Sequence, residues 1–385
     1  MPQTTDWATW VPSTPYTIGV EEEFMLLEPD TLGLAQRGAD AVDELPDAIR
    51  SHLSRETHGC ALELSTAPEA SVPRLGEVLQ AHRDDVEREL AQHGLAVASA
   101  GTHPFAMWTE IEVTDSARYR RVYDSMRELA RREPTFALHV HVGVEHAERA
   151  TFLHDRLRAH VPMLLALSAN SPFWQGRDSG LASARTSIFQ AFPRVGIPRG
   201  FGSYAEWVEA VDVMLRCGAF PEPTYLWWDV RLQPRFGTVE VRIMDAQACT
   251  ADTVALCALV QSVARLELEE GYASPATLGA PEVLDENRFL AARDGMDASF
   301  LDPDGERVVP ARDELARLLA AAAPHAAALG CGEELAGVEA LGRSTGAERQ
   351  RQSASDHGLE AVVADLALCY GDPATSRSWV SAPAR

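Results

Sequence analysis

The sequence contains no lysine, so arginine alone provides the 34 basic residues of the 385-residue chain. A P-loop needs the lysine of GxxxxGK[ST] to reach the phosphates, and a Schiff-base enzyme needs a side-chain amine. Both classes of site are therefore excluded. Any phosphate that this protein handles must be bound by arginine side chains, backbone amides or metal ions.

Several other signals are missing. No GxGxxG follows a predicted strand, which argues against a dinucleotide-binding Rossmann unit. The six cysteines form no CxxC pair and no disulfide-like spacing, so in a chain of this length we expect reduced, mostly buried thiols.

Neither a targeting signal nor a membrane span is predicted. The opening segment, "MPQTTDWATWVPSTPYT", lacks a basic start followed by an apolar block. The longest uncharged stretch, 161–176, is too short to cross a bilayer and is interrupted by Pro162 and Pro172. The formal net charge of −23 argues against nucleic acid or an anionic membrane surface as a partner. We therefore expect a cytoplasmic protein.

Hydrophobic periodicity predicts a mixture of helices and strands without a regular βαβ order, which indicates an α+β fold. Apolar residues three and four apart predict helices at 74–94, 117–132, 149–168, 204–217, 252–271, 313–329 and 359–369. Two-residue alternation predicts strands at 17–27, 60–65, 95–100, 136–144 and 238–244. From about residue 272 the chain is predicted to be mainly helical, with a turn or small hairpin at 302–310.

Four of the predicted strands share one design. In "TIGVEEEFML" (17–26), Glu21 and Glu23 lie on one face, whereas Glu22 lies with the apolar residues on the other. The same alternation separates an apolar face from a polar face in the strands near 63, 139 and 240. The residues on these polar faces are Glu21, Glu23, Glu63, His139, His141, Glu240 and Arg242.

Two interpretations of this face stay open. An antiparallel sheet can simply expose its polar face to water. Carboxylates gathered on one face nevertheless repel each other unless cations lie between them, and oxygen ligands with one or two imidazoles suit Mg²⁺ or Mn²⁺. The His-x-His pair alternatively suggests a metal-dependent amidohydrolase, although the later histidines, His325 and His357, lie in helical or loop surroundings.

Six segments resemble one known family. Taken together and in this order, they are similar to the type 2 glutamate–cysteine ligases, a family of carboxylate–amine ligases. The segments are "GVEEEF" (19–24), "HVHVG" (139–143), "SPFWQGRDSGLASAR" (171–185), "GTVEVRIMD" (237–245), "ENRFLAARDGMDA" (286–298) and "GAERQRQ" (346–352).

The resemblance implies one catalytic domain over 1–385 with a glutamine-synthetase-like fold. In that fold a curved antiparallel sheet forms a funnel and helices cover its outer face. The implied metal ligands are Glu21, Glu23, Glu63, Glu240 and one of His139 and His141. Glu56 is a further candidate if the chain bends near residues 58–59, because seven residues along one continuous strand would place it on the face opposite Glu63.

Arginines must balance the charge of the reaction, since making an acyl phosphate brings two anions together. Arg242, beside Glu240, is the leading catalytic candidate, with Arg185 as a further one. The candidates for binding the nucleotide or substrate are Arg231, Arg235, Arg343 and Arg349.

The function implied by the resemblance is ATP-dependent formation of a γ-glutamyl amide. Glutamate would be joined to cysteine or another amino acid or amine, with Mg²⁺ as cofactor, or Mn²⁺ in its place, and with a homodimer left open. Two alternatives remain at this stage: a catalytically weak binding or regulatory paralogue of the same fold, and the metal-dependent amidohydrolase.

Overall fold

The computed structural model describes residues 6–131 and 134–371. The last residue of the helix predicted at 117–132 and both ends of the predicted domain 1–385 lie outside the described residues.

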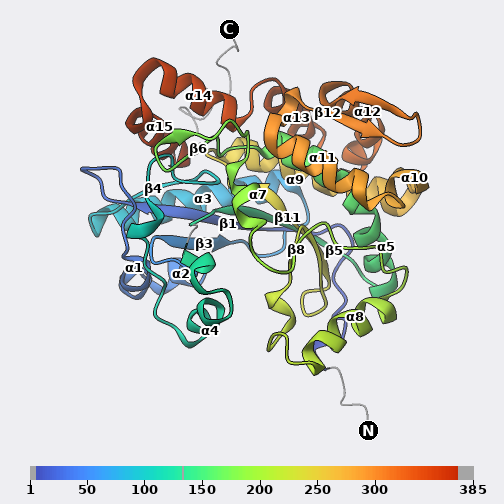
Figure 1. Ribbon diagram of the computed structural model, residues 1–385, viewed down its shortest axis with the longest axis horizontal. Coiled ribbons are helices and arrows are strands. Elements are labelled where there is room, and N and C mark those ends of the chain that lie inside the picture. Colours follow the sequence, from blue (N-terminus) through green and yellow to red (C-terminus); the bar gives the residue numbers. More distant parts are fainter. Residues whose placement is uncertain (1–5, 132–133, 372–385) are drawn as a thin grey trace.

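A seven-stranded antiparallel sheet forms the centre of the molecule (Figure 1). Its strands follow the order β10-β11-β5-β1-β3-β2, and β4 also pairs with β1. Every ladder of this sheet is antiparallel, as predicted, and the sheet does not close into a barrel. The strands are β1 (Ile18–Leu27), β2 (Leu53–Arg55), β3 (Ala61–Ser65), β4 (Ala96–Ala98), β5 (Ala137–Gly143), β10 (Val230–Gln233) and β11 (Thr238–Asp245).

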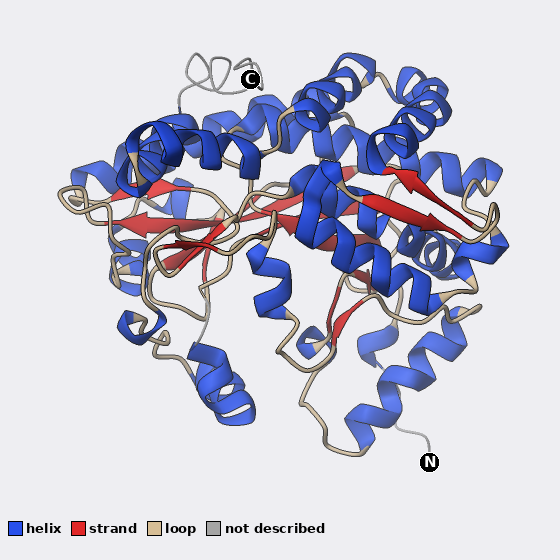
Figure 2. Ribbon diagram, turned by 45° about the horizontal axis from the view of Figure 1, so that its top comes forward, coloured by secondary structure: helices blue, strands red, loops and turns tan. Residues whose placement is uncertain are grey.

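Helices cover one face of the sheet in two layers (Figure 2). The first layer packs its apolar side chains against the apolar face of the strands, which confirms the α+β prediction. It consists of α3 (Val72–Gln92), α5 (Ala147–Leu157), α6 (Val161–Ser168) and α9 (Thr250–Glu270). Farther out lie α11 (Pro281–Asp294), α12 (Ala311–Leu329), α13 (Gly332–Arg343) and α14 (Gly346–His357), whereas α15 (Leu359–Gly371) packs directly against β4 and α3. Among the described residues, no helix combines the length and the apolarity needed to span a membrane.

The other face of the sheet is flanked rather than covered. In Figure 1, α4 (Ala117–Met126) and α8 (Tyr204–Arg216) project from the side opposite α13 and α14. The short helix α7 (Ala184–Phe189) lies near the middle of the sheet in the same view. The polar face of the central strands therefore opens into the space between these projecting elements.

The predicted helices and strands are largely confirmed, with local corrections. Pro162 begins a new helix, so the predicted helix 149–168 is divided into α5, a 3-10 turn (Arg158–His160) and α6. The helix predicted at 117–132 ends at Met126 and continues as a 3-10 turn, because Arg127 has a positive φ of 57°. The predicted hairpin at 302–310 is confirmed as β12 (Ser299–Asp302) and β13 (Arg307–Pro310).

The segment around Glu56 also differs from the prediction. The expected bend at residues 58–59 is a complete chain reversal, so that β2 and β3 are separate strands that pair with each other. Glu56 follows β2 directly, and the reversal allows it to reach the side of the sheet on which Glu63 lies.

Glu22 fixes the opposite face of β1 to the helices. Arg83 on α3 donates from Nε and Nη2 to the two carboxylate oxygens of Glu22, at 2.9 and 2.8 Å. Thr253 on α9 donates to the same carboxylate at 2.6 Å. Arg83 also donates to the backbone carbonyls of Gln247 and Ala248. All these contacts are buried, so Glu22 has the structural role expected of the one glutamate that points away from its neighbours.

Replacing Arg83 with methionine should lower the free energy of unfolding by about 3–5 kcal/mol, because the Glu22 carboxylate would stay buried without its partner. Denaturant titration measures the change. Arg74→Met in the same helix is the matched control, since Arg74 forms only an exposed ion pair with Glu77. Equal stability of the two variants would contradict the structural role of the buried pair.

Candidate active site

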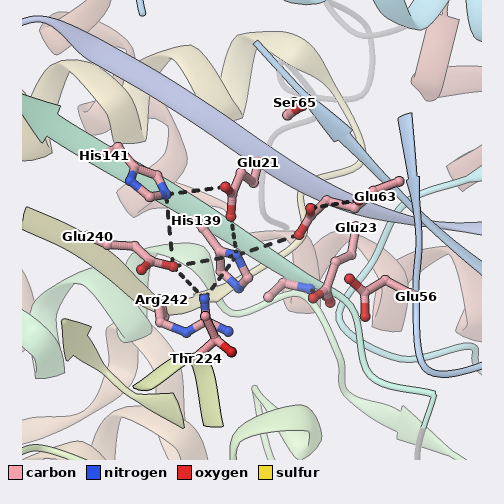
Figure 3. Close-up of polar contacts among 12 residues, drawn as sticks. Glu21, Glu23, Glu56, Glu63, Ser65, His139, His141, Thr224, Glu240 and Arg242 are labelled. Atoms are coloured by element: carbon pink, nitrogen blue, oxygen red, sulfur yellow. Dashed lines mark hydrogen bonds and ion pairs between the residues drawn. The ribbon is translucent and has the colours of Figure 1, made fainter. Parts of the chain in front are cut away.

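The polar face of the sheet is organised as three cross-strand rows. In the first row, Glu23 on β1 lies opposite Glu63 on β3. In the second, Glu21 lies opposite His139 on β5. In the third, His141 lies opposite Glu240 on β11, and Glu240 lies opposite Arg231 on β10. Because successive rows are two residues apart, their side chains project to the same side, as Figure 3 shows.

These rows form the floor of a cavity of about 680 Å³, which Glu21, Glu23, Glu63, His139 and Arg231 line directly, whereas His141 and Glu240 are buried and do not line it. Such a volume lies within the range of about 300–1,000 Å³ that is typical of ligand sites. One wall comes from α4 with Arg118 and Tyr119, and another from the 3-10 turn Pro223–Tyr225. Besides Tyr119, the aromatic lining residues are Trp7, Phe189, Phe192, Trp207, Trp227 and Phe236. The cavity therefore combines a strongly charged floor with apolar walls.

Two groups of side chains on the floor could each hold a metal ion, and they share His139. One group is Glu21, His139 and Glu240, and the other is Glu23, Glu63 and His139; within each, the ligand atoms lie within 4.8 Å of one another. His139 Nδ1 is 3.3 Å from Glu21, 4.0 Å from Glu63 and 3.9 Å from Glu240. Two ligands of one Mg²⁺ at right angles are about 3 Å apart, given metal–oxygen distances of about 2.1 Å. The spacing and the oxygen-rich donor set thus fit Mg²⁺ or Mn²⁺.

Three glutamates at one end of the floor retain protons unusually strongly. Burial and the charge of Glu63 raise the pKa of Glu23 to about 7. Burial and the charge of Glu23 raise the pKa of Glu56 to about 8. Burial and the neighbouring charges of Glu21 and Glu56 raise the pKa of Glu63 well above its ordinary value. Arg242, Arg185 and Arg118 offset these effects only in part, so this end of the floor has too little positive charge to keep all three carboxylates ionised without a cation.

The two histidines differ in their surroundings. Burial, with the nearby charge of Arg242, lowers the pKa of His139 to about 4, so its ring is neutral and can bind a metal. His141 Nδ1 is 2.9 Å from the hydroxyl of Thr238, whereas its buried Nε2 has no hydrogen-bond partner and lies 3.5 Å from Glu21. Burial alone would lower the pKa of His141, but the charge of Glu240 and the interaction with Glu21 together outweigh burial and raise it.

Arginines balance the other end of the floor. Arg231 donates from Nε and Nη2 to Glu240 at 2.8 and 3.1 Å, and Arg242 Nη1 contacts the same carboxylate. Although burial opposes ionisation, these two guanidinium groups hold the pKa of Glu240 well below its ordinary value. Arg242 also lies 3.4 Å from His139 Nδ1. The guanidinium of Arg242 therefore faces the centre of the candidate metal site (Figure 3).

The other predicted arginines divide into two sets. Arg185 and Arg235 line the cavity. Arg343 and Arg349 do not line it, so the structure does not place these two candidates for nucleotide binding beside the cavity. Arg343 is exposed at the end of α13 beside Glu339. Arg349 lies on the buried side of α14, where it pairs with Asp252 on α9.

Sequence patterns did not indicate several lining residues. Arg118 bridges two walls by donating to Glu222 at 2.7 Å and to Thr224 at 3.3 Å. Tyr119, beside it, contacts the backbone carbonyl of Arg55. These residues lie in helices and turns whose place beside the sheet follows from tertiary packing, so no spacing in the sequence indicates them. All six cysteines lie in the described chain, and none lines this cavity.

Comparison with known proteins gives concordant findings. The family model described as glutamate–cysteine ligase family 2 matches residues 17–364. A Rubrobacter xylanophilus protein provisionally named glutamate–cysteine ligase 2-1 is 41% identical over 338 residues, covering 88% of this chain and 90% of that protein. A glutamate–cysteine ligase of Natronomonas pharaonis is 33% identical over 360 residues, covering 91% of this chain and 95% of its own.

Two solved structures share the fold at low sequence identity. The glutamate–cysteine ligase of Francisella tularensis, in complex with AMP, gives a TM-score of 0.66 at 15% identity and covers 96% of this chain and 90% of that chain. A bifunctional glutathione synthetase from Pasteurella multocida gives a TM-score of 0.70 at 13% identity. That match covers 95% of this chain and 53% of the other.

Mg²⁺ should raise the melting temperature of this protein, and by more at pH 8 than at pH 6. Between pH 4.5, the ordinary pKa of glutamate, and about 8, the folded metal-free protein binds more protons at Glu23, Glu56 and Glu63 than the unfolded chain does. These groups therefore reduce stability as pH rises through that window, and a bound cation removes the repulsion. Thermal unfolding with and without Mg²⁺ at pH 6, 7 and 8 measures the effect.

The variant Glu63→Gln serves as the comparison, because it removes one ligand and one charge from the floor. It should show a smaller Mg²⁺-induced shift than the wild type at pH 8. A wild-type shift that is absent, or that does not change between pH 6 and 8, would show that the carboxylates do not gather a cation.

Proposed function

The chain belongs to glutamate–cysteine ligase family 2, whose members are ATP-dependent ligases that form carbon–nitrogen bonds, and we propose that it joins the γ-carboxylate of glutamate to the amino group of cysteine or another amine. ATP would first phosphorylate the carboxylate, and the amine would then displace phosphate from the acyl phosphate. The observation that carries this proposal is the arrangement of the cavity floor. Two candidate metal-binding groups of side chains share His139, and His139 lies directly beside the guanidinium of Arg242.

The floor is suited to bringing anions together. A carboxylate and a triphosphate repel each other, so a catalyst for their reaction must supply positive charge in a site with little water. The glutamates with raised pKa values lie at one end of the floor and the arginines at the other. The glutamates can therefore hold cations while the arginines contact anionic oxygens directly.

We assign the cation ligands to Glu21, Glu23, Glu63, Glu240 and His139, with Glu56 adjoining Glu23. When bound, Mg²⁺ or Mn²⁺ would withdraw charge from phosphoryl oxygens as a Lewis acid. The protein's own contribution is to fix these ligands. Arg231 keeps Glu240 ionised and oriented through its paired donors, and the neutral ring of His139 leaves a nitrogen lone pair available.

Arg242 is the residue that we expect to contact the transferring group. Its guanidinium projects from the floor beside Glu240, and both flank His139. A planar guanidinium can donate two parallel hydrogen bonds to phosphoryl oxygens, and this stabilises charge that develops during transfer. Arg185, which also lines the cavity, is held by the backbone carbonyl of Ile243 at 2.9 Å.

The two alternative functions predict different chemistry. An amidohydrolase would act without ATP, and its zinc site would require more than the one histidine that both metal-binding groups include. A weak paralogue would bind nucleotide without turnover. Each of the two metal-binding groups found among the described residues contains a single histidine, His139, among carboxylates, and this donor set favours the ligase.

A phosphate-release screen tests the proposal. Purified protein is incubated with ATP, Mg²⁺ and glutamate, and a panel of amino acids and amines is added one at a time. We expect phosphate release that needs both glutamate and one class of amine, with the amide product detected by mass spectrometry. Hydrolysis of an amide without ATP would favour the amidohydrolase, and ATP binding without turnover would favour the paralogue.

Arg242→Ala should lower kcat by about a hundredfold or more, the scale seen when a charge-stabilising donor is removed from an active site. Arg242→Lys should recover little of this loss, because an ammonium group cannot replace the planar fork. Single-turnover phosphate formation and melting temperature are measured for both. Arg216→Ala, which removes an exposed arginine of α8, is the control. Near-normal kcat with a lower melting temperature would instead assign Arg242 a structural role.

A further inference from the structure

Arg242 lies in an irregular part of β11. The antiparallel register between β11 and β5 shifts between Val241 and Met244, so residues 242–243 lose their regular partners in β5. Such bulges redirect a side chain and often lie beside active sites. The backbone N–H and C=O groups of residues 242–243 must therefore find hydrogen-bond partners outside β5. The positions of these partners determine where the guanidinium of Arg242 points.

The partners are Asp229, which extends the β10–β11 pairing by one residue, and Arg185 on α7. The backbone N–H of Arg242 donates to the carbonyl oxygen of Asp229 at 2.8 Å. Arg185 on α7 donates to the carbonyls of Arg242 and Ile243 at 3.3 and 2.9 Å. The bulge is thus held on its N–H side by Asp229 and on its carbonyl side by Arg185.

Asp229 is in turn held by α11. Arg288 donates from Nε and Nη2 to the two carboxylate oxygens of Asp229, at 2.6 and 3.3 Å. The remaining nitrogen, Nη1, donates to Gln190 at the end of α7 at 2.7 Å. Asp229 is 4% exposed and Arg288 is 8% exposed, so this ion pair is buried. A chain of direct contacts therefore runs from α11 through Asp229 to Arg242 and Glu240.

The space around this chain is nearly filled. A cavity of only about 10 Å³ remains between Arg185, Asp229, Arg242 and Arg288, which is about the space of one water molecule. Asp229 is the partner of Arg288 there, and so little space is left that the bulge cannot shift without moving these side chains.

We propose that Arg288 and Asp229 are positioning residues that hold the 242–243 bulge so that the Arg242 guanidinium stays against Glu240 on the cavity floor. This rests on the proposed function, in which Arg242 contacts the transferring phosphoryl group. The buried Glu22–Arg83 pair, which has a structural role, makes no contact with the acting residue. In the Arg288–Asp229 pair, by contrast, the backbone carbonyl of Asp229 accepts directly from the N–H of Arg242 at 2.8 Å.

A double-mutant cycle tests the proposal. Arg288→Gln and Asp229→Asn should each lower kcat by about tenfold or more while KM for ATP changes by less than about threefold, because a displaced donor weakens the transition state more than the ground state. In an Arg242→Ala background, where no guanidinium remains to be positioned, each change should lower single-turnover phosphate formation by less than about twofold further. Losses that multiply in that background would overturn the proposal.

The matched control is Arg156→Gln, which breaks another largely buried ion pair, with Glu267 at 2.5 Å, away from the bulge. It should lower the melting temperature and leave kcat unchanged. If Arg288→Gln does not fold, Gln190→Leu disturbs the same pair more mildly by removing only the acceptor of Arg288 Nη1. An unchanged kcat in a folded variant of the pair would also overturn the proposal.

A crystal structure of Asp229→Asn separates this inference from the proposed function. If the wild type forms no phosphate with any amine, the ligase proposal fails, but the structure of the variant still reports on the bulge. We expect the contact between Arg242 and Glu240 to be lost. An unmoved Arg242 would contradict the positioning role whatever reaction the protein catalyses.

Discussion

The two-residue pleat of β1 is the constraint on which both halves of this molecule depend. Glu22 points toward the helices, where Arg83 and Thr253 enclose it, and Glu21 and Glu23 point into the cavity. One strand therefore fixes the core and supplies the floor of the site at the same time. A shift of register by one residue would place two carboxylates in the apolar layer and remove both from the floor.

The charges on the floor are separated rather than mixed. Arginines surround Glu240 and keep it ionised, whereas Glu23, Glu56 and Glu63 have few positive neighbours and hold protons instead. Carboxylates with raised pKa values in a cleft are typical of sites that await a cation or a positively charged ligand. Arginine provides a contact here that lysine could not make, because the planar fork of Arg231 holds the Glu240 carboxylate through two parallel hydrogen bonds.

The sequence predicted those parts of the site that follow from local periodicity. Glu21, Glu23, Glu63, His139, His141, Glu240 and Arg242 face one side because strands alternate, and the structure brings all of them together. Periodicity also predicted the larger helices, since their apolar stripes pack on the sheet. The family resemblance supplied what periodicity could not, namely the antiparallel funnel-like arrangement and the candidacy of Glu56.

Features that depend on tertiary packing escaped the sequence. Arg349 was expected at the nucleotide but lies against Asp252, because the direction in which a helical arginine points depends on how the whole helix is docked. The irregular register of β11 has no marker in "GTVEVRIMD", which alternates as a regular strand would. The residues that hold this bulge are Asp229, just before β10, Arg185 on α7 and Arg288 on α11, which lie 13, 57 and 46 residues from Arg242 along the chain. The outer helix α11 is thus connected to the cavity floor through the ion pair between Arg288 and Asp229. This contact gives the segment 286–298 a proposed positioning role that its helical pattern alone does not indicate.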